Sequence, residues 1–187
     1  MRNVDWCKDC AIRLFNKKHY NLQGVGNPWS GKCIVVPNVD YDAYKTGDMS
    51  FSKQVELIKQ IIPFSTGEEE PNLYILPLIR CNERISCKLD NESYRKCLHY
   101  FAEDVSKYDF RDILLLGDAG RRFLSIDITS WFNTIFVSSN NRRYAVNYSP
   151  FISYVNSNKF ETFKTNLYKW YNAVSNIDFK GYEIKRI

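Results

Sequence analysis

The arrangement of four of the six cysteines constrains this chain more than any other feature of its sequence. Cys7 and Cys10 form a C-x2-C pair near the start, and Cys81 and Cys97 lie near the middle with fifteen residues between them. A zinc ribbon would need a second closely spaced pair. Four thiolates from two distant segments can instead ligate one 4Fe-4S cluster, which would hold the N-terminal segment against the rest of the fold.

The same cysteines could also be reduced core residues, since free cysteine is among the most buried residue types. Cys33 opens an apolar segment and is expected in the core, whereas Cys87, between the two distal cysteines, is an alternative ligand. A disulfide framework is not expected, because no signal peptide precedes Cys7 and a chain of 187 residues can build a core without cross-links. We therefore expect a reducing, cytoplasmic compartment.

Composition indicates a single domain over residues 1–187, of which 44% are hydrophobic. No stretch approaches the about 18 consecutive apolar residues of a membrane span, so no membrane partner is expected. The net charge of +5, with 13 tyrosines and 12 phenylalanines, suits a surface on which cations contact phosphates and rings stack on bases. DNA is therefore a candidate partner, although many folded domains carry a similar charge.

Apolar strand-like segments alternate with helical patterns along the chain. Strands are predicted at 33–37, 73–79, 112–116 and 133–137, and helices at 52–62, 91–105, 118–124 and 158–174. Pro77 should end the hydrogen-bond ladder of the second strand. This alternation predicts a three-layer α/β/α fold with a central, mainly parallel four-stranded sheet. Because open parallel sheets bind ligands beyond the carboxyl ends of their strands, the segments that follow the strands should surround the site.

The order of these features resembles the iron–sulfur branch (families 4 and 5) of the uracil-DNA glycosylase superfamily over nearly the whole chain. The matching segments are Cys7 to Cys10, Gly24-Val25-Gly26-Asn27-Pro28, Asp40-Tyr41-Asp42 with Gly47 to Phe51, Cys81, Cys97, Leu116-Gly117 and Asn147-Tyr148-Ser149-Pro150. The cysteine layout is the most specific of these. The resemblance implies a DNA glycosylase, a hydrolase of N-glycosyl bonds in base-excision repair, whose 4Fe-4S cluster would be held by Cys7, Cys10, Cys81 and Cys97. We expect it to be a monomer.

The chain departs from this family at the positions that carry the chemistry. The family's histidine in the last loop falls on Ser149, and its base-reading asparagine falls on Pro77. Its G-E-x-P-G loop reads Pro37-Asn38-Val39-Asp40-Tyr41 here. The lost histidine would have stabilised the departing base, and the lost asparagine would have read its edge. We therefore expect weak or no excision of uracil.

Two hypotheses follow from these departures. In the first, the smaller Ser149 and Pro77 leave a roomier pocket for a base other than uracil, such as a modified base in viral DNA. In the second, catalysis is lost and the fold remains as a DNA-binding or protein-docking module. The sequence contains no second motif that would indicate a redox or sensing role for the cluster.

The first group of candidate site residues lies in the segment after the first predicted strand. Asp40 and Asp42 would stabilise the sugar cation or activate water, with Asn38 beside them, but all three are also ordinary turn residues. Phe51, or one of Tyr41 and Tyr44, would stack on a flipped base, although Phe51 could equally be a hydrophobic staple of the next helix.

The second group lies near the end of the chain's last predicted strand. Asn147 and Ser149 would contact the base or the DNA, or would only shape a turn before Pro150. Arg142 and Arg143 would hold phosphates or fill the gap that a flipped nucleotide leaves, and their plainer explanation is a solvated basic loop.

Overall fold

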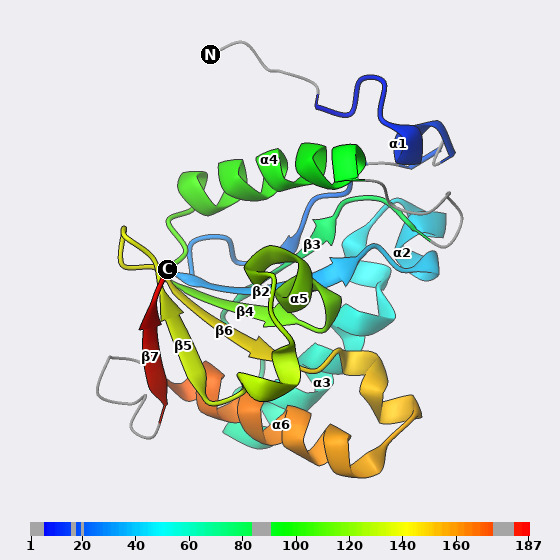
Figure 1. Cartoon of the computed structure of the whole chain (residues 1–187). Coiled ribbons are helices and arrows are strands. Elements are labelled where there is room, and N and C mark those ends of the chain that lie inside the picture. Colours follow the sequence, from blue (N-terminus) through cyan, green and yellow to red (C-terminus); the bar gives the residue numbers. More distant parts are fainter. Residues whose placement is uncertain (1–5, 16–17, 20, 84–90, 174–181) are drawn as a thin grey trace.

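The computed structural model describes residues 6–15, 18–19, 21–83, 91–173 and 182–187. In these residues the chain forms one seven-stranded sheet, in the order β1-β3-β2-β4-β6-β5-β7, with helices on both faces (Figure 1). The strands are β1 (Val25–Gly26), β2 (Lys32–Asn38), β3 (Tyr74–Ile79), β4 (Asp112–Leu116), β5 (Thr134–Val137), β6 (Arg143–Asn147) and β7 (Glu183–Arg186). The helices are α1 (Ala11–Phe15), α2 (Tyr41–Thr46), α3 (Lys53–Thr66), α4 (Asn91–Lys107), α5 (Asp118–Leu124) and α6 (Ser157–Asn172), with short 3-10 helices η1 (Met49–Phe51), η2 (Ile128–Ser130) and η3 (Pro150–Tyr154).

The four central strands, β3, β2, β4 and β6, run parallel to one another. β1 is antiparallel to β3 and β5 is antiparallel to β6, whereas β7 is parallel to β5. The predicted three-layer α/β/α fold with a mainly parallel sheet is therefore confirmed. The sheet is wider than the four strands predicted, and it is mixed.

The fourth parallel strand is not the segment that the sequence suggested. Residues 133–137 do contain a strand, β5, but it runs antiparallel to its neighbour β6. The parallel position is taken by β6, for which the sequence predicts no strand. Only Tyr144, Ala145 and Val146 of β6 are apolar, and three residues between polar flanks are too short a run to indicate a strand.

Pro77 does not end the ladder of β3, contrary to expectation. It pairs with Val36 of β2, and the parallel register continues as far as Asn38 and Ile79. On the other side, β1 pairs only with Tyr74 and Ile75. Beyond these residues the outer edge of β3 pairs with no described strand, which is where a sheet tolerates proline.

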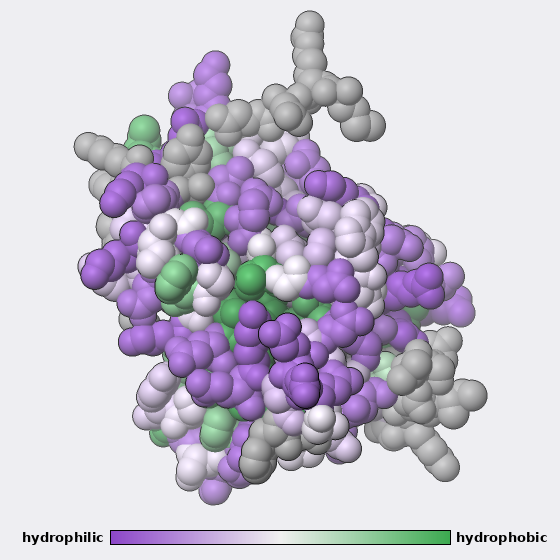
Figure 2. Space-filling view, turned by 180° about the vertical axis from the view of Figure 1, so that it is seen from behind, coloured by the Kyte–Doolittle hydropathy of each residue, from purple (hydrophilic) through white to green (hydrophobic). Residues whose placement is uncertain are grey.

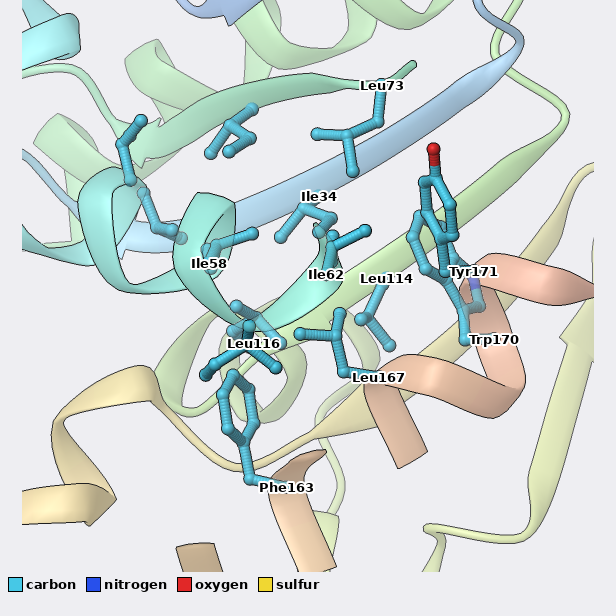
Figure 3. Close-up of a cluster of buried hydrophobic side chains, with 14 of the residues drawn as sticks. Ile34, Ile58, Ile62, Leu73, Leu114, Leu116, Phe163, Leu167, Trp170 and Tyr171 are labelled. Carbon is cyan, nitrogen blue, oxygen red and sulfur yellow. The ribbon is translucent and has the colours of Figure 1, made fainter. Parts of the chain in front are cut away.

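The sheet separates two hydrophobic cores, because successive residues of a strand point to opposite faces. On one face, Ile34 and Val36 of β2 pack with side chains of α3 and α6. Figure 3 shows part of this core, in which Ile62, Phe163 and Leu167 meet the strands. On the other face, Cys33 and Val35 pack with side chains of α4 and α5. Cys33 is fully buried, so its predicted core position is confirmed.

Viewed from behind, the surface is mostly hydrophilic, with a small apolar area near its centre (Figure 2). Among the residues that the structure describes, Trp29, Tyr154 and Val155 are large apolar side chains that are 71%, 71% and 76% exposed. Over the residues that the structure describes, no helix combines the length and the apolar character needed to cross a membrane.

Candidate functional site

A pocket of about 280 Å³ opens beyond the carboxyl ends of the central strands, where an open parallel sheet is expected to bind its ligand. Four residues predicted for the site line it: Asn38, Asp40, Tyr41 and Ser149. Each follows or ends one of the parallel strands, Asn38 at the end of β2 and Ser149 two residues after β6. The structure therefore brings together residues that the sequence places more than a hundred positions apart.

Gly117 explains how two of the pocket walls come so close. Its φ of 52° and ψ of −126° belong to a backbone region that is open essentially to glycine alone. A Cβ atom at this position would lie 2.9 Å from the Cβ of Ser149. The N–H of Gly117 donates to the carbonyl of Asn147 at 2.8 Å. The Leu116-Gly117 step thus holds the start of α5 directly against the loop that carries Ser149.

Asp40 sits at the pocket with both carboxylate oxygens occupied. It is the N-cap of α2, and its Oδ1 accepts a hydrogen bond from the N–H of Ala43 at 3.1 Å. Its Oδ2 accepts from the hydroxyl of Ser52 at 2.6 Å and from the N–H of Gln54 at 3.4 Å. A carboxylate fixed in orientation by three donors is suited to stabilising a nearby cation.

Asn38 belongs to a polar chain that the sequence analysis did not anticipate. Its Nδ2 donates to Oε2 of Glu83 at 2.5 Å, and Oε1 of Glu83 accepts from Arg122 at 2.8 Å. The side chains of Glu83 and Arg122 are 16% and 26% exposed, so this ion pair is largely shielded from water. The chain fixes the orientation of the Asn38 amide at the pocket.

Two further amides line the pocket and were missed by the sequence analysis. The side chain of Asn82 is buried, and its Nδ2 donates to the carbonyl of Val39 at 3.0 Å. The side chain of Gln54, also buried, donates through Nε2 to the carbonyl of Asn38 at 3.0 Å. The signal for Asn82 was its position directly after Cys81, at the end of a buried strand. Gln54 gave no such signal, because it lies inside a helix.

Aromatic and acidic side chains complete the lining. Tyr41 is 58% exposed at the pocket, and Phe151 of η3, also missed from the sequence, is partly buried there. Asp118, the first residue of α5, brings a second carboxylate and is paired with Arg121 at 3.1 Å. The pocket therefore brings carboxylates, amides, a hydroxyl and aromatic rings together around a volume of about 280 Å³.

Three predicted residues lie near this end of the sheet without lining the pocket. Asp42 is on α2 and forms an ion pair with Lys53 at 3.4 Å. Phe51 is 60% exposed on η1. Asn147 is fully buried, with its Nδ2 donating to the carbonyl of Phe163 and its Oδ1 accepting from the N–H of Tyr148, both at 2.9 Å. Asn147 thus joins β6 to α6 inside the protein.

Arg142 and Arg143 lie at the opposite end of β6 from Ser149, so their predicted proximity to the pocket is wrong. The register pairs Arg143 with Asp112, the first residue of β4. The two side chains form a bidentate ion pair with distances of 2.6 and 2.7 Å. Arg142 contacts the end of α4 through the carbonyl of Val105 at 3.3 Å.

The four cysteines predicted as ligands lie together on the flank of the sheet. Cys7, Cys10, Cys81 and Cys97 are all 5% exposed or less. Cys10, Cys81 and Cys97 share one small apolar cluster with Ile12 and Ile79. Burial raises the pKa of Cys81 to about 12 and the pKa of Cys97 to about 11, and nearby thiols, Cys7 and Cys10 among them, contribute to both increases. Such a group of buried thiols favours deprotonation only where a cationic centre is bound.

An iron–sulfur cluster and a single metal ion place different demands on four thiol ligands. In the described residues, no three His, Cys, Asp or Glu side chains are arranged to hold one metal ion. A 4Fe-4S cluster has four separate iron atoms for four thiolates, so its ligands need not converge on one point. Cys87, the alternative ligand, lies outside the described residues.

Polar and aromatic contacts hold the N-terminal cysteine pair against α4. The Trp6 ring stacks on His99 with a centroid distance of 4.0 Å, and its Nε1 donates to Glu103 at 3.2 Å. The ammonium of Lys96 donates to the carbonyls of Lys8 and Asp9, at 3.3 and 3.4 Å. These contacts place the C-x2-C pair beside Cys97.

Comparison with models of known protein families finds no match for this chain, and no curated protein matches it either.

Proposed function

We propose that this chain is a DNA glycosylase-like enzyme, which flips a base of DNA into the pocket beyond the central strands and hydrolyses its N-glycosidic bond. The observation that carries the proposal is the set of groups gathered in that one pocket: carboxylates, amides and aromatic rings. The resemblance to iron–sulfur uracil-DNA glycosylases and the grouping of the four cysteines support it.

The size of the pocket favours a base as its occupant. Its volume of about 280 Å³ is close to the lower end of ligand pockets, so a flipped base fits while the sugar stays at the mouth. Tyr41 and Phe151 offer rings on which a base can stack. Tyr154 and Val155, which follow Phe151, are 71% and 76% exposed and could enter the gap left in the duplex.

The amides suit recognition of the base edge. Asn82 and Gln54 are held in place by hydrogen bonds to backbone carbonyls, so their orientation is set before the base arrives. No described group donates to Oε1 of Gln54, which leaves this oxygen free to accept from a base N–H. Asn82 offers an amide of the kind that the family resemblance would place at Pro77. The target that we propose is a modified base other than uracil.

The carboxylates suit the reaction itself. Cleavage of the glycosidic bond builds positive charge on the sugar, and a fixed anion stabilises that charge. Asp40 is the fixed anion of the pocket, since three donors hold it. Asp118 is 51% exposed and can orient the attacking water. Ser149 lies where it can donate to the departing base.

The cluster has a structural part in this proposal. Cys7, Cys10, Cys81 and Cys97 would hold it, and when bound it would supply a covalent link between the N-terminal segment, the end of β3 and α4. Such a link requires reduced thiols and therefore a reducing, cytoplasmic compartment. The enzyme would act on DNA as a monomer, because one chain supplies every group of the pocket.

A catalytically inactive DNA-binding module on the same fold is the second candidate. The hydrogen bonds of Asp40 favour the inactive module, because they show a structural role for this carboxylate. It caps α2 and joins α2 to α3. In that case the pocket would bind a flipped base or a strand end without cleaving it.

An abasic-site assay separates the two candidates. Duplex oligonucleotides that contain uracil, a modified pyrimidine or only the four normal bases are incubated with the protein, and abasic sites are then cleaved with alkali. The enzyme proposal expects cleavage at the modified base and weak or no cleavage at uracil. Binding without cleavage of any of these oligonucleotides would favour the inactive module.

A further inference from the structure

A second pocket, of about 470 Å³, lies at the opposite edge of the sheet, where the parallel strands begin. The register places Lys32 beside Asp112 and Asp112 beside Arg143 at the starts of β2, β4 and β6. The turn before β2 and the segment after α4 form the remaining walls, which include Trp29 and Arg111. This pocket is separated from the candidate active site by the length of the strands.

Most charges in this pocket already have partners. Asp112 and Arg143 neutralise each other in a bidentate pair with side chains only 9% and 15% exposed. The ammonium of Lys32 donates to the carbonyls of Tyr171 and Ala173 at the end of α6. These groups form the charged floor of the pocket and are not available to pair with a ligand.

Arg111 is different, because its guanidinium is exposed and has no anionic partner within the described part of the chain. Its backbone is held on both sides, with its N–H donating to Gly31 at 2.9 Å and its carbonyl accepting from Arg143 at 2.8 Å. Asp112, the next residue in the sequence, pairs with Arg143, and Asp109, two residues before Arg111, lies 3.8 Å from Arg142. Arg111 is therefore an unpaired cation on a fixed segment of backbone.

Trp29 supplies a fixed aromatic surface at the same pocket. Its side chain is 71% exposed, although it packs at 83° against Tyr108 with a centroid distance of 5.3 Å. The turn that carries it is fixed by Asn27, whose Oδ1 accepts from the N–H of Trp29 at 3.0 Å and whose Nδ2 donates to Asn72 at 2.8 Å. An indole held in one orientation loses little conformational entropy when a ring stacks on it.

We propose that this pocket binds a nucleoside 5′-monophosphate, with the base stacked on Trp29 and the phosphate paired with Arg111. A ring and a fork of N–H donors are the groups that recognise a base and a phosphate, respectively. The volume falls within the range of sites for ligands of this size. The proposal does not depend on a glycosylase activity in the other pocket.

Isothermal titration calorimetry of the full chain with dAMP tests the proposal. Saturable binding is expected, with much weaker binding of deoxyadenosine and of inorganic phosphate, because each offers only half of the contacts. Trp29→Ala and Arg111→Gln should each weaken dAMP binding by about tenfold. Both side chains are exposed, so neither change should unfold the protein, which thermal unfolding can check.

Two control variants locate the binding. Arg95→Gln removes an exposed arginine of α4 that is not in the pocket, and it should leave dAMP binding unchanged. Tyr41→Ala alters the candidate active site and should also leave it unchanged. The proposal is overturned if dAMP does not bind, if Trp29→Ala and Arg111→Gln bind it normally, or if Tyr41→Ala is the variant that loses it. A 5′-phosphorylated oligonucleotide that binds through the same two side chains more tightly than dAMP would identify a strand end as the source of the nucleotide.

Discussion

At the scale of single residues, the candidate site depends on a few side chains whose positions are set by the backbone around them. Asp40 faces the pocket because it caps α2, and Ser149 faces it because Gly117 leaves room for the loop. Asp42 is only two residues from Asp40, but it does not line the pocket and it pairs with Lys53. The two carboxylates can therefore be tested against each other.

Asp40→Asn should reduce base excision by about a hundredfold, because it removes the anion that would stabilise the sugar cation while keeping the shape of the side chain. Asn is also a good N-cap, so α2 should remain. Asp42→Asn is the matched control and should leave excision nearly unchanged. Single-turnover excision rates measure both. Undiminished excision in the Asp40 variant would remove this residue from the mechanism.

Gly117→Ala should lower the free energy of unfolding by about 3 kcal/mol, because alanine is strained at this backbone conformation and its Cβ would overlap Ser149. Gly67→Ala is the control, since Gly67 also has a positive φ but no atom lies within 4 Å of its added Cβ. That change should cost about 1–2 kcal/mol. Urea unfolding of both variants measures the difference in their free energies of unfolding. Equal losses in the two variants would contradict the close contact between Gly117 and Ser149.

At the scale of elements, the sequence predicted most strands and helices but assigned one strand to the wrong role. The long apolar segments of β2, β3 and β4 and the helical patterns of α3, α4 and α6 are strong enough to identify from periodicity. β6 has only three apolar residues, so the sequence favours 133–137 as the fourth parallel strand. Because β5 is antiparallel, the loop with Arg142 ends at the amino edge of the sheet, away from the pocket.

The same reasoning explains which site residues were found. Asn38 and Asp40 follow a strand that was recognised, and the rule that ligands bind at carboxyl ends placed them correctly. Gln54 and Phe151 were missed because they reach the pocket from helices, and only the packing of those helices on the sheet brings them there. No local pattern in the sequence carries that information.

Ser52 connects two helices at the pocket, and its loss should destabilise both. Its hydroxyl accepts from the N–H groups of Gln54 and Val55 at the start of α3 and donates to Asp40 at the start of α2. Ser52→Ala should lower the free energy of unfolding by about 1–2 kcal/mol. Ser50→Ala, at an exposed position of η1, is the control and should change it little. If urea unfolding gives the same free energy for the Ser52 and Ser50 variants, the Ser52 cap does not stabilise the protein.

At the scale of the whole molecule, α4 covers one face of the sheet (Figure 1). Four cysteines from the N-terminal segment, the residues after β3 and α4 lie together at its flank. Anaerobically purified protein should contain about four iron atoms per chain and absorb visible light. Cys97→Ala should lose the iron and become less soluble, whereas Cys33→Ala, which changes a core cysteine, should keep it. Stoichiometric zinc, or no metal, in the wild-type protein would contradict the cluster.

Mass spectrometry of the free bases released from DNA tests the central claim most directly. The substrates are uracil-containing DNA, virus-derived DNA with modified bases, and unmodified DNA from the same preparation method. A glycosylase with this pocket should release a modified base, little uracil and none of the four normal bases, and the release should be lost in Asp40→Asn. Absence of any released base from all three substrates, by protein that carries its cluster and binds DNA, would contradict the account.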